Sequence, residues 1–330
     1  MCTHQHSLHT IPSTEIRLAC PTFPPGHDIL VRVHSHSGQI SSLAYCRSFL
    51  FVPGNRPERF HKALSAGADL VCIDFEDAVA PGSAKDDARR LTLAELPRLC
   101  GEDDYKSRIV LRINSLKTPV GLQDVQALQE HAGWLPPIVV PKVDSPADLH
   151  TLDALLSKAN GPEPSWMPMI ETARALEAAP SIACALPLNR MLGLLIGCVD
   201  LSVELDCALE WEPLLYARSR VVHAASLAGL RAIDSPNLDT TNPVALEEES
   251  RRAARLGFVG KSAIHPSQIA PIHRAFAPSE EQITGARAVV SAYERMSGGV
   301  ALLDGKLIER PVYMAAKRLL STADFRQGEQ

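Results

Sequence analysis

The sequence predicts an α/β fold, a (β/α)8 TIM barrel with an N-terminal extension and a C-terminal helical lid segment. Eight short apolar runs occur from residue 47 onward without clean polar and apolar alternation, and longer amphipathic segments separate them. Unbroken apolar runs are typical of parallel strands covered on both faces, and regular β/α alternation is typical of a closed parallel barrel. We therefore expect an extension over residues 1–45, a barrel over 46–275 and a lid segment over 276–330.

The predicted strands follow one another at regular intervals. They are RSFLFVP (47–53), DLVCIDFED (69–77), RIVLRIN (108–114), PPIVVPKV (136–143), WMPMIE (166–171), RMLGLLIG (190–197), LRAIDSP (230–236) and FVGKSAIHP (258–266). Helical patterns between them include 55–67, 83–100, 146–160 and 242–257, several of which end in glycine, as helices often do. An open doubly wound sheet is the alternative, but its GxGxxG turn is replaced here by GNRPER.

The two ends of the chain add to a minimal barrel. After the eighth predicted strand comes a long helical pattern over 267–296, then a DGK triplet that reads as a tight turn, and a final helix after Pro311. The first 36 residues hold six of the twelve histidines, His4, His6, His9, His27, His34 and His36. No carboxylate or cysteine joins them at ligand spacing, so we expect an extension there and not a metal site.

Composition excludes several classes of protein. With 330 residues and 45% hydrophobic content, the chain can bury one large core. A net charge of -5, 5% aromatic residues and the lack of a long basic run argue against a nucleic-acid partner. No apolar run reaches the ~18 residues that a membrane helix needs, and the N-terminus lacks the features of an export signal. The eight cysteines form no CxxC motif, so we expect buried thiols and a cytoplasmic protein.

Polar residues gather where the predicted strands end, which is where TIM barrels carry their chemistry. In chain order they are Asp74, Glu76, Asp77, Arg112, Asn114, Lys142, Glu171, Asp200, Asp234, Lys261 and His265. One acidic strand end would be ordinary, because a strand often surfaces into a solvated loop. Carboxylates, cations and a histidine on one rim instead predict an active site.

Glu171 and Asp200 both follow wholly apolar strands. An isolated ionised carboxylate is costly in such surroundings, and a divalent cation would compensate its charge. Two carboxylates, with waters and substrate oxygens, fit octahedral Mg²⁺ better than zinc. Arg112 lies inside the apolar run VLRIN, where a guanidinium suits either bidentate capture of a small carboxylate or a structural pair with Glu76.

Seven segments in this order carry a family resemblance. RSFLFVPGNRPERFHKAL, IDFEDAV with the following Lys85, LRIN, VVPKV, IETARAL, GCVDLSVEL and GKSAIHPSQI resemble the citrate lyase β-subunit-like branch of the HpcH/HpaI aldolase family, over roughly residues 46 to 320. That branch includes malyl-CoA, methylmalyl-CoA and citramalyl-CoA lyases. The resemblance implies Mg²⁺-dependent cleavage or formation of a 3-hydroxyacyl-CoA thioester by Claisen-type chemistry, in a homotrimer or homohexamer.

The resemblance also implies roles for single residues. Glu171 and Asp200 match the metal ligands, Arg112 matches the arginine that holds the substrate carboxylate, Phe51, Lys62, Ile264 and His265 match thioester contacts, and Glu76 and Asp77 match an acidic pair behind the metal waters. In the segment GKLIERP, Glu309 stands where relatives carry an aspartate that acts as acid and base over a neighbouring active site. The alternative for Glu309 is a solvated residue that pairs with Arg310 or Lys306.

This chain departs from the pattern at two places. Glu58 replaces a lysine that some relatives use for CoA, and Cys198 with Val199 precede Asp200 where relatives carry an acidic residue. Two other functions therefore stay open, a CoA-independent 2-keto acid aldolase of the same fold and a non-catalytic acyl-CoA-binding subunit.

Overall fold

A computed structural model describes residues 16–19, 28–31, 43–101, 103–131, 134–157, 164–296 and 300–327. The chain divides into two compact units, Met1–Gln39 and Ile40–Gln330. In the first unit, β1 (Ile16–Ala19) pairs with β2 (Asp28–Val31) in antiparallel fashion. The six histidines near the N-terminus lie outside the described residues, and the boundaries expected at residues 45 and 275 stay a prediction.

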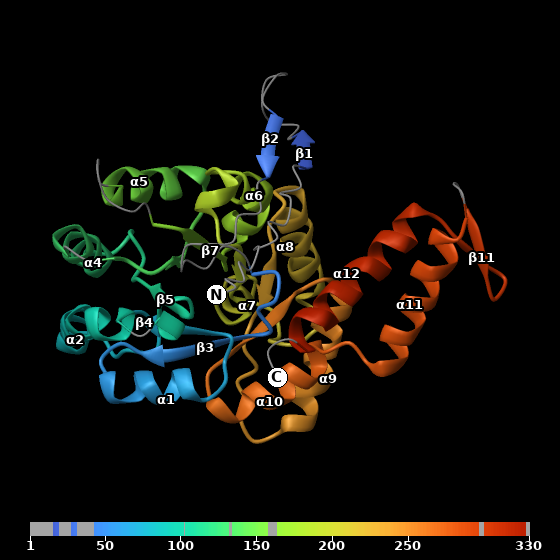
Figure 1. Ribbon diagram of the computed structural model, residues 1–330. Coiled ribbons are helices and arrows are strands. Elements are labelled where there is room, and N and C mark those ends of the chain that lie inside the picture. The colour runs from blue at the N-terminus through green and yellow to red at the C-terminus, as the bar shows by residue number, and fades with distance from the viewer. Residues whose placement is uncertain are drawn as a thin grey trace, which may run out of the picture. The chain divides into compact units, whose positions relative to one another are not determined.

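The second unit is built on a closed barrel of eight parallel strands (Figure 1), which confirms the predicted TIM barrel. Each of the eight apolar runs contains one strand. They are β3 (Ser48–Pro53), β4 (Leu70–Asp74), β5 (Ile109–Arg112), β6 (Ile138–Val140), β7 (Trp166–Ile170), β8 (Leu194–Ile196), β9 (Ala232–Asp234) and β10 (Gly260–Ala263). The strands follow chain order around the barrel, and pairing of β10 with β3 closes it.

Helices connect the strands and surround the barrel (Figure 1). The described ones are η1 (Pro57–Arg59), α1 (Phe60–Ser65), α2 (Ser83–Cys100), α3 (Asp103–Lys106), α4 (Pro119–Glu130), α5 (Pro146–Leu156), α6 (Ala173–Ala183), η2 (Leu188–Arg190), α7 (Cys198–Glu204), α8 (Leu215–Leu227), α9 (Pro243–Leu256), η3 (Pro266–Gln268) and α10 (Ile269–Phe276). Side chains of Thr118, Thr172 and Asn242 accept backbone N–H groups at the starts of α4, α6 and α9. None of the described helices combines the length and apolarity that crossing a membrane requires.

Successive residues of each strand point to opposite faces, which creates two separate hydrophobic layers. One cluster fills the barrel interior and includes Phe49, Cys72, Val110, Met167, Leu195 and Ile233. The residues that flank them along the strands belong to the larger cluster between strands and helices. Among the described cysteines, Cys46, Cys72 and Cys198 are buried, as predicted, while Cys184 and Cys207 are half-buried.

The C-terminal segment has its own small core. The predicted helical stretch 267–296 is interrupted, because Ala277 is extended before Pro278, as the residue before a proline tends to be. Beyond the break, α11 (Glu280–Glu294) packs against α12 (Arg310–Gln327), the final helix that the sequence predicted. Between them, β11 (Ala301–Leu303) and β12 (Lys306–Ile308) form a hairpin around Asp304 and Gly305, which confirms the DGK turn.

The barrel closes around a glycine. A Cβ atom built on Gly260 would lie 2.6 Å from the carbonyl oxygen of Arg47 on the neighbouring strand segment. We expect Gly260→Ala to lower the free energy of unfolding by ~1–3 kcal/mol, the usual cost of overpacking a rigid site. Urea unfolding measures this change. The matched control is Gly285→Ala in α11, where a Cβ would meet nothing within 4 Å; equal stability of the two variants would contradict the account of closure.

Candidate active site

The inward-facing layer at the carboxyl ends of the strands is polar. Asp74, Arg112 and Glu171 continue the inward positions of β4, β5 and β7 beyond the apolar interior, and all three are buried. Asp74 and Arg112 are also direct partners in the β4–β5 register. Strand parity therefore brings charged groups from three different strands to one mouth of the barrel.

Asp74 organises this layer. Its carboxylate accepts a bidentate pair of hydrogen bonds from Arg112, Nε to Oδ1 at 2.6 Å and Nη2 to Oδ2 at 2.6 Å. The same two oxygens accept the backbone N–H groups of Glu76 at 2.8 Å and Ala78 at 2.9 Å. Four donors satisfy a carboxylate that is fully buried, so one residue fixes both the guanidinium and the loop after β4.

Lys85 holds the same loop from outside. Its ammonium donates to the backbone carbonyls of Phe75 at 2.8 Å and Glu76 at 2.7 Å. The loop that carries Glu76 and Asp77 is therefore tied at its backbone on both sides.

The remaining edge of Arg112 faces more carboxylates. Its Nη1 lies 2.9 Å from Oε2 of Glu76 and 3.6 Å from Oδ2 of Asp77, and the guanidinium lies 4.6 Å from the centre of the Phe51 ring. From the sequence, Glu76 was considered as the structural partner of Arg112. The structure shows that Asp74, which was not considered, accepts the two parallel hydrogen bonds from Arg112. The signal was available, because Asp74 and Arg112 end adjacent strands of equal parity.

Glu171 lies in a slot that only glycine can form. The side chain of Glu171 is 1% exposed, and a Cβ atom on Gly197 would lie 2.5 Å from its Oε2 and 2.6 Å from its Cβ. Its Oε1 accepts the backbone N–H of Lys142 at 2.7 Å. Burial raises the pKa of Glu171 above its ordinary value, with Lys142 opposing that shift. A buried carboxylate of this kind calls for a compensating cation.

Asp200 approaches Glu171 from the first turn of α7, and the ammonium of Lys142 lies between the two. That ammonium contacts Oδ2 of Asp200 and lies 3.7 Å from Oε1 of Glu171. The side chain of Asp200 is 38% exposed, so this end of the pair opens to solvent. Lys142 is the second residue whose contact role the sequence did not predict.

Negative charge exceeds positive charge at the mouth. Five carboxylates, Asp74, Glu76, Asp77, Glu171 and Asp200, share two side-chain cations, Arg112 and Lys142, and we call these seven residues the mouth cluster. Burial raises the pKa of Glu76 to about 8, because Arg112 is already shared with Asp74, and Glu171 and Asp77 add repulsion.

The donor set suits a cation that keeps most of its water. Within the described residues, no group of three or more His, Cys, Asp or Glu side chains could hold a metal ion. Glu171 and Asp200 alone would leave the other positions to water and substrate oxygens. That is how Mg²⁺ is usually bound, whereas zinc takes more protein ligands with nitrogen or sulfur donors. The residues therefore fit Mg²⁺.

The predicted thioester contacts lie on neighbouring connections. Phe51 is half-buried on β3 beneath Arg112, and Lys62 is exposed on α1. Ile264 and His265 follow β10, and both are exposed. The side-chain oxygen of Gln268 accepts the backbone N–H of Ile264 at 2.8 Å, which fixes this turn.

Two residues expected at the rim lie elsewhere. Asp234 and Lys261 are fully buried and pair at 2.6 Å on the helix-facing side, where Arg218 and Glu249 join them. Asp234 follows the inward-facing Ile233, so parity turns it outward. Asn114 follows β5 at the carboxyl end of the barrel and donates to Asp124 of α4. The prediction that Asp234 and Lys261 belong to the rim was wrong.

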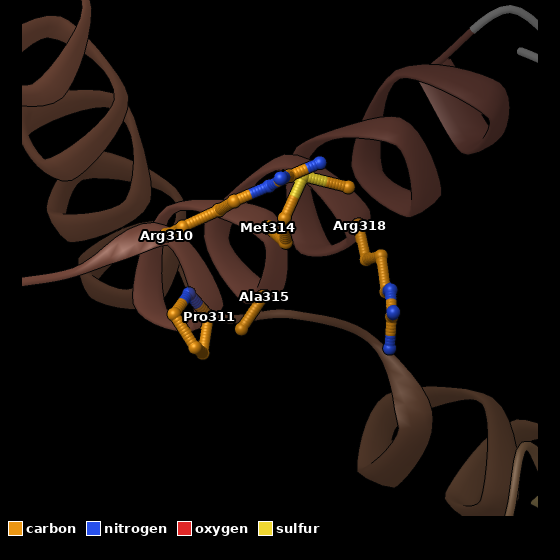
Figure 2. Close-up of a pocket in the computed structure, with 5 residues that line it drawn as sticks. All are labelled: Arg310, Pro311, Met314, Ala315 and Arg318. Carbon is orange, nitrogen blue, oxygen red and sulfur yellow. The ribbon is translucent and has the colours of Figure 1, made fainter. Parts of the chain in front are cut away.

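Glu309 is exposed just before α12. In the described part of the chain, no ion pair joins Glu309 to Arg310, to Lys306 or to the mouth cluster. A hollow of about 400 Å³ on α12 (Figure 2) is lined by Arg310, Pro311, Met314, Ala315 and Arg318. It contains no member of the mouth cluster, so it is a separate surface.

Known proteins are similar to this chain in sequence and in fold. A model of the HpcH/HpaI aldolase/citrate lyase family matches residues 47–266, and a model described as a C–C bond lyase of the TIM-barrel fold matches residues 217–325. Citrate lyase subunit beta of Leuconostoc mesenteroides subsp. cremoris is 33% identical over 290 residues, covering 84% of this chain and 93% of the relative. The L-malyl-CoA/beta-methylmalyl-CoA lyase of Cereibacter sphaeroides is 31% identical over 307 residues, covering 84% and 95%. The crystal structure of CitE from Mycobacterium tuberculosis with magnesium, acetoacetate and coenzyme A is similar with a TM-score of 0.72 at 32% identity, over 86% of this chain and all of that one.

The glycine slot gives a test of the cation site. We expect Gly197→Ala to displace the Glu171 carboxylate and to weaken divalent-cation binding by roughly 10- to 100-fold, the usual effect of disturbing the support of a ligand. Titration calorimetry measures the affinity, and Gly285→Ala serves as a control far from the mouth. Wild-type affinity in Gly197→Ala would show that cation binding does not depend on the close approach of Glu171 to Gly197.

The pKa of Glu76 predicts how stability changes with pH in metal-free buffer. Because its pKa is about 8 in the folded protein and near its ordinary value of 4.5 in the unfolded chain, the folded state holds the extra proton between these values. The free energy of unfolding should therefore fall as pH rises from 5 to 8. Glu76→Gln should show a smaller fall in urea unfolding, whereas the exposed Glu58→Gln should follow the wild type. Parallel curves for all three proteins would refute the shift.

Proposed function

Because the chain belongs to the HpcH/HpaI aldolase/citrate lyase family and is a carbon–carbon lyase, we propose that it cleaves or forms a 3-hydroxyacyl-CoA thioester, such as citramalyl-CoA or malyl-CoA, with the help of Mg²⁺. The observation that carries this proposal is the excess of carboxylates in the mouth cluster around the buried Glu171. Relatives named malyl-CoA lyase and a structural neighbour with magnesium, acetoacetate and coenzyme A support it.

Glu171 and Asp200 would hold the cation. When bound there, Mg²⁺ supplies a Lewis acid that draws electron density from the substrate oxygens as the carbon–carbon bond breaks. Glu171 is buried, so it would fix the position of the cation. Asp200 is partly exposed, so it would bind the cation on the side that is open to solvent and substrate.

The chain's own groups would then orient the substrate and move protons. Asp74 holds one edge of Arg112, and the Nη1 group, which faces Glu76 and Asp77, would offer one positive contact to a substrate carboxylate. Cleavage requires one base that takes the proton of the 3-hydroxyl group and one acid that protonates the acyl α-carbon. Glu76 and Asp77, which lie beside Arg112, are the carboxylates that would take the 3-hydroxyl proton.

Glu309 would be the acid that protonates the acyl α-carbon. Since Glu309 is exposed and lies at the start of α12, it can act over the mouth of a second copy of the chain in a homotrimer or homohexamer. Its carboxylate is one methylene longer than aspartate, and its position decides how well it can transfer a proton.

The metal ligands provide the first functional test. We expect mass spectrometry with Mg²⁺ to detect cleavage or formation of malyl-, citramalyl- or methylmalyl-CoA, and we expect Glu171→Gln and Asp200→Asn to lose both Mg²⁺ affinity and activity. Asp206→Asn, an exposed change just after α7, is the matched control. Turnover of free 2-keto acids alone would favour the CoA-independent aldolase, and Mg²⁺ binding without turnover of any thioester would favour a binding subunit.

Glu309 provides a second test that is independent of metal binding. We expect Glu309→Ala to slow exchange of the α-protons of a bound acyl-CoA by ~10²-fold or more, the usual contribution of a positioned base, and Glu309→Asp to recover part of the rate. Proton NMR in deuterated buffer follows the exchange, and Mg²⁺ affinity should be unchanged. Wild-type exchange in the alanine variant would show that Glu309 is only a solvated residue.

A further inference from the structure

Lys142 contacts both carboxylates of the cation site with two different groups. Its backbone N–H donates to Oε1 of Glu171, and its side-chain ammonium contacts Asp200 and lies 3.7 Å from the same Glu171 oxygen. Its φ angle is 53°, in the left-handed region that residues other than glycine rarely adopt. This unusual backbone conformation directs the N–H group of Lys142 to Glu171.

The backbone of Lys142 is anchored, but its side chain has freedom. The carbonyl oxygen of Lys142 accepts from the ammonium of Lys117 at 2.6 Å, and Lys117 also pairs with Asp144 at 2.5 Å. The peptide groups on both sides of Lys142 are thereby fixed. Its side chain is 29% exposed, so the ammonium has a path to solvent while the N–H donor remains on Glu171.

An ammonium and a divalent cation place different demands on the same oxygens. The ammonium carries one charge and donates at ~2.8 Å, whereas Mg²⁺ carries two charges and sits at ~2.1 Å from its oxygen ligands. Two cations within that range of one carboxylate oxygen repel each other strongly in a partly buried site. Binding of the metal therefore requires the ammonium to withdraw from Asp200.

We propose that Lys142 sets the affinity of the metal site, as a built-in counter-ion that competes with Mg²⁺ for Asp200 while its backbone N–H keeps Glu171 in position. The inference rests on the proposed function for the identity of the metal. Lys142 is a positioning residue in this account, because its N–H acts through Glu171. The competition keeps the affinity low enough for exchange with solution and keeps the two carboxylates together before the metal arrives.

The test replaces the ammonium and retains the backbone donor. Lys142→Met should bind Mg²⁺ about tenfold more tightly in titration calorimetry, because the competitor is gone. Lys306→Met is the control, since it removes the same charge from an exposed lysine of β12 that pairs with no member of the mouth cluster within the described residues. Its affinity should remain within about threefold of the wild type.

The melting temperature provides a second measurement, which remains informative if Lys142→Met is less stable than the wild type. Addition of Mg²⁺ should raise the melting temperature of Lys142→Met by more than that of the wild type, because a tighter ligand stabilises the folded state more. Equal or weaker binding in Lys142→Met, with Glu171→Gln still abolishing binding, would overturn the competition and leave the proposed function intact. A wild-type protein that binds no divalent cation would overturn both.

Discussion

The bidentate ion pair between Asp74 and Arg112 is the interaction on which the rest of the mouth depends. Neither group would be stable alone in this position, because both are buried and breaking such a pair by removing one partner typically costs about 3–5 kcal/mol. The pair also directs function. Asp74 holds the loop that presents Glu76 and Asp77, and it turns the free edge of Arg112 toward them. Position and charge at the mouth therefore follow from one strand-to-strand contact.

A second constraint follows from the first. Once Asp74 has taken the larger share of Arg112, the other carboxylates have fewer cations to offset their burial, and burial raises the pKa values of Glu76 and Glu171 despite the opposing effect of Arg112 and Lys142. Gly197 lets Glu171 approach the wall of the barrel closely, and Lys142 supplies both a donor and a cation that can leave. A divalent cation would restore the balance, which connects the packing of the barrel to the chemistry of the family.

The sequence was sufficient for the fold and for the region of the site. Apolar runs predicted all eight strands, because a parallel strand that is covered on both faces must be apolar along its whole length. Strand ends predicted where charge collects. Sequence reasoning failed where the answer depends on which face a residue occupies, so Asp234 and Lys261 were assigned to the rim although they pair behind the wall. It also missed the conformation of Lys142, since no local pattern reports a left-handed backbone at a non-glycine residue.

The central claim is that Glu171 and Asp200 hold a divalent cation while Arg112 remains bound to Asp74. Anomalous diffraction from crystals grown with Mn²⁺ in place of Mg²⁺ tests it most directly. The account predicts one peak within bonding distance of both carboxylates, the ammonium of Lys142 withdrawn from Asp200, and the bidentate pair of Asp74 and Arg112 preserved. A peak elsewhere, or an Arg112 released from Asp74 when the metal is bound, would contradict it.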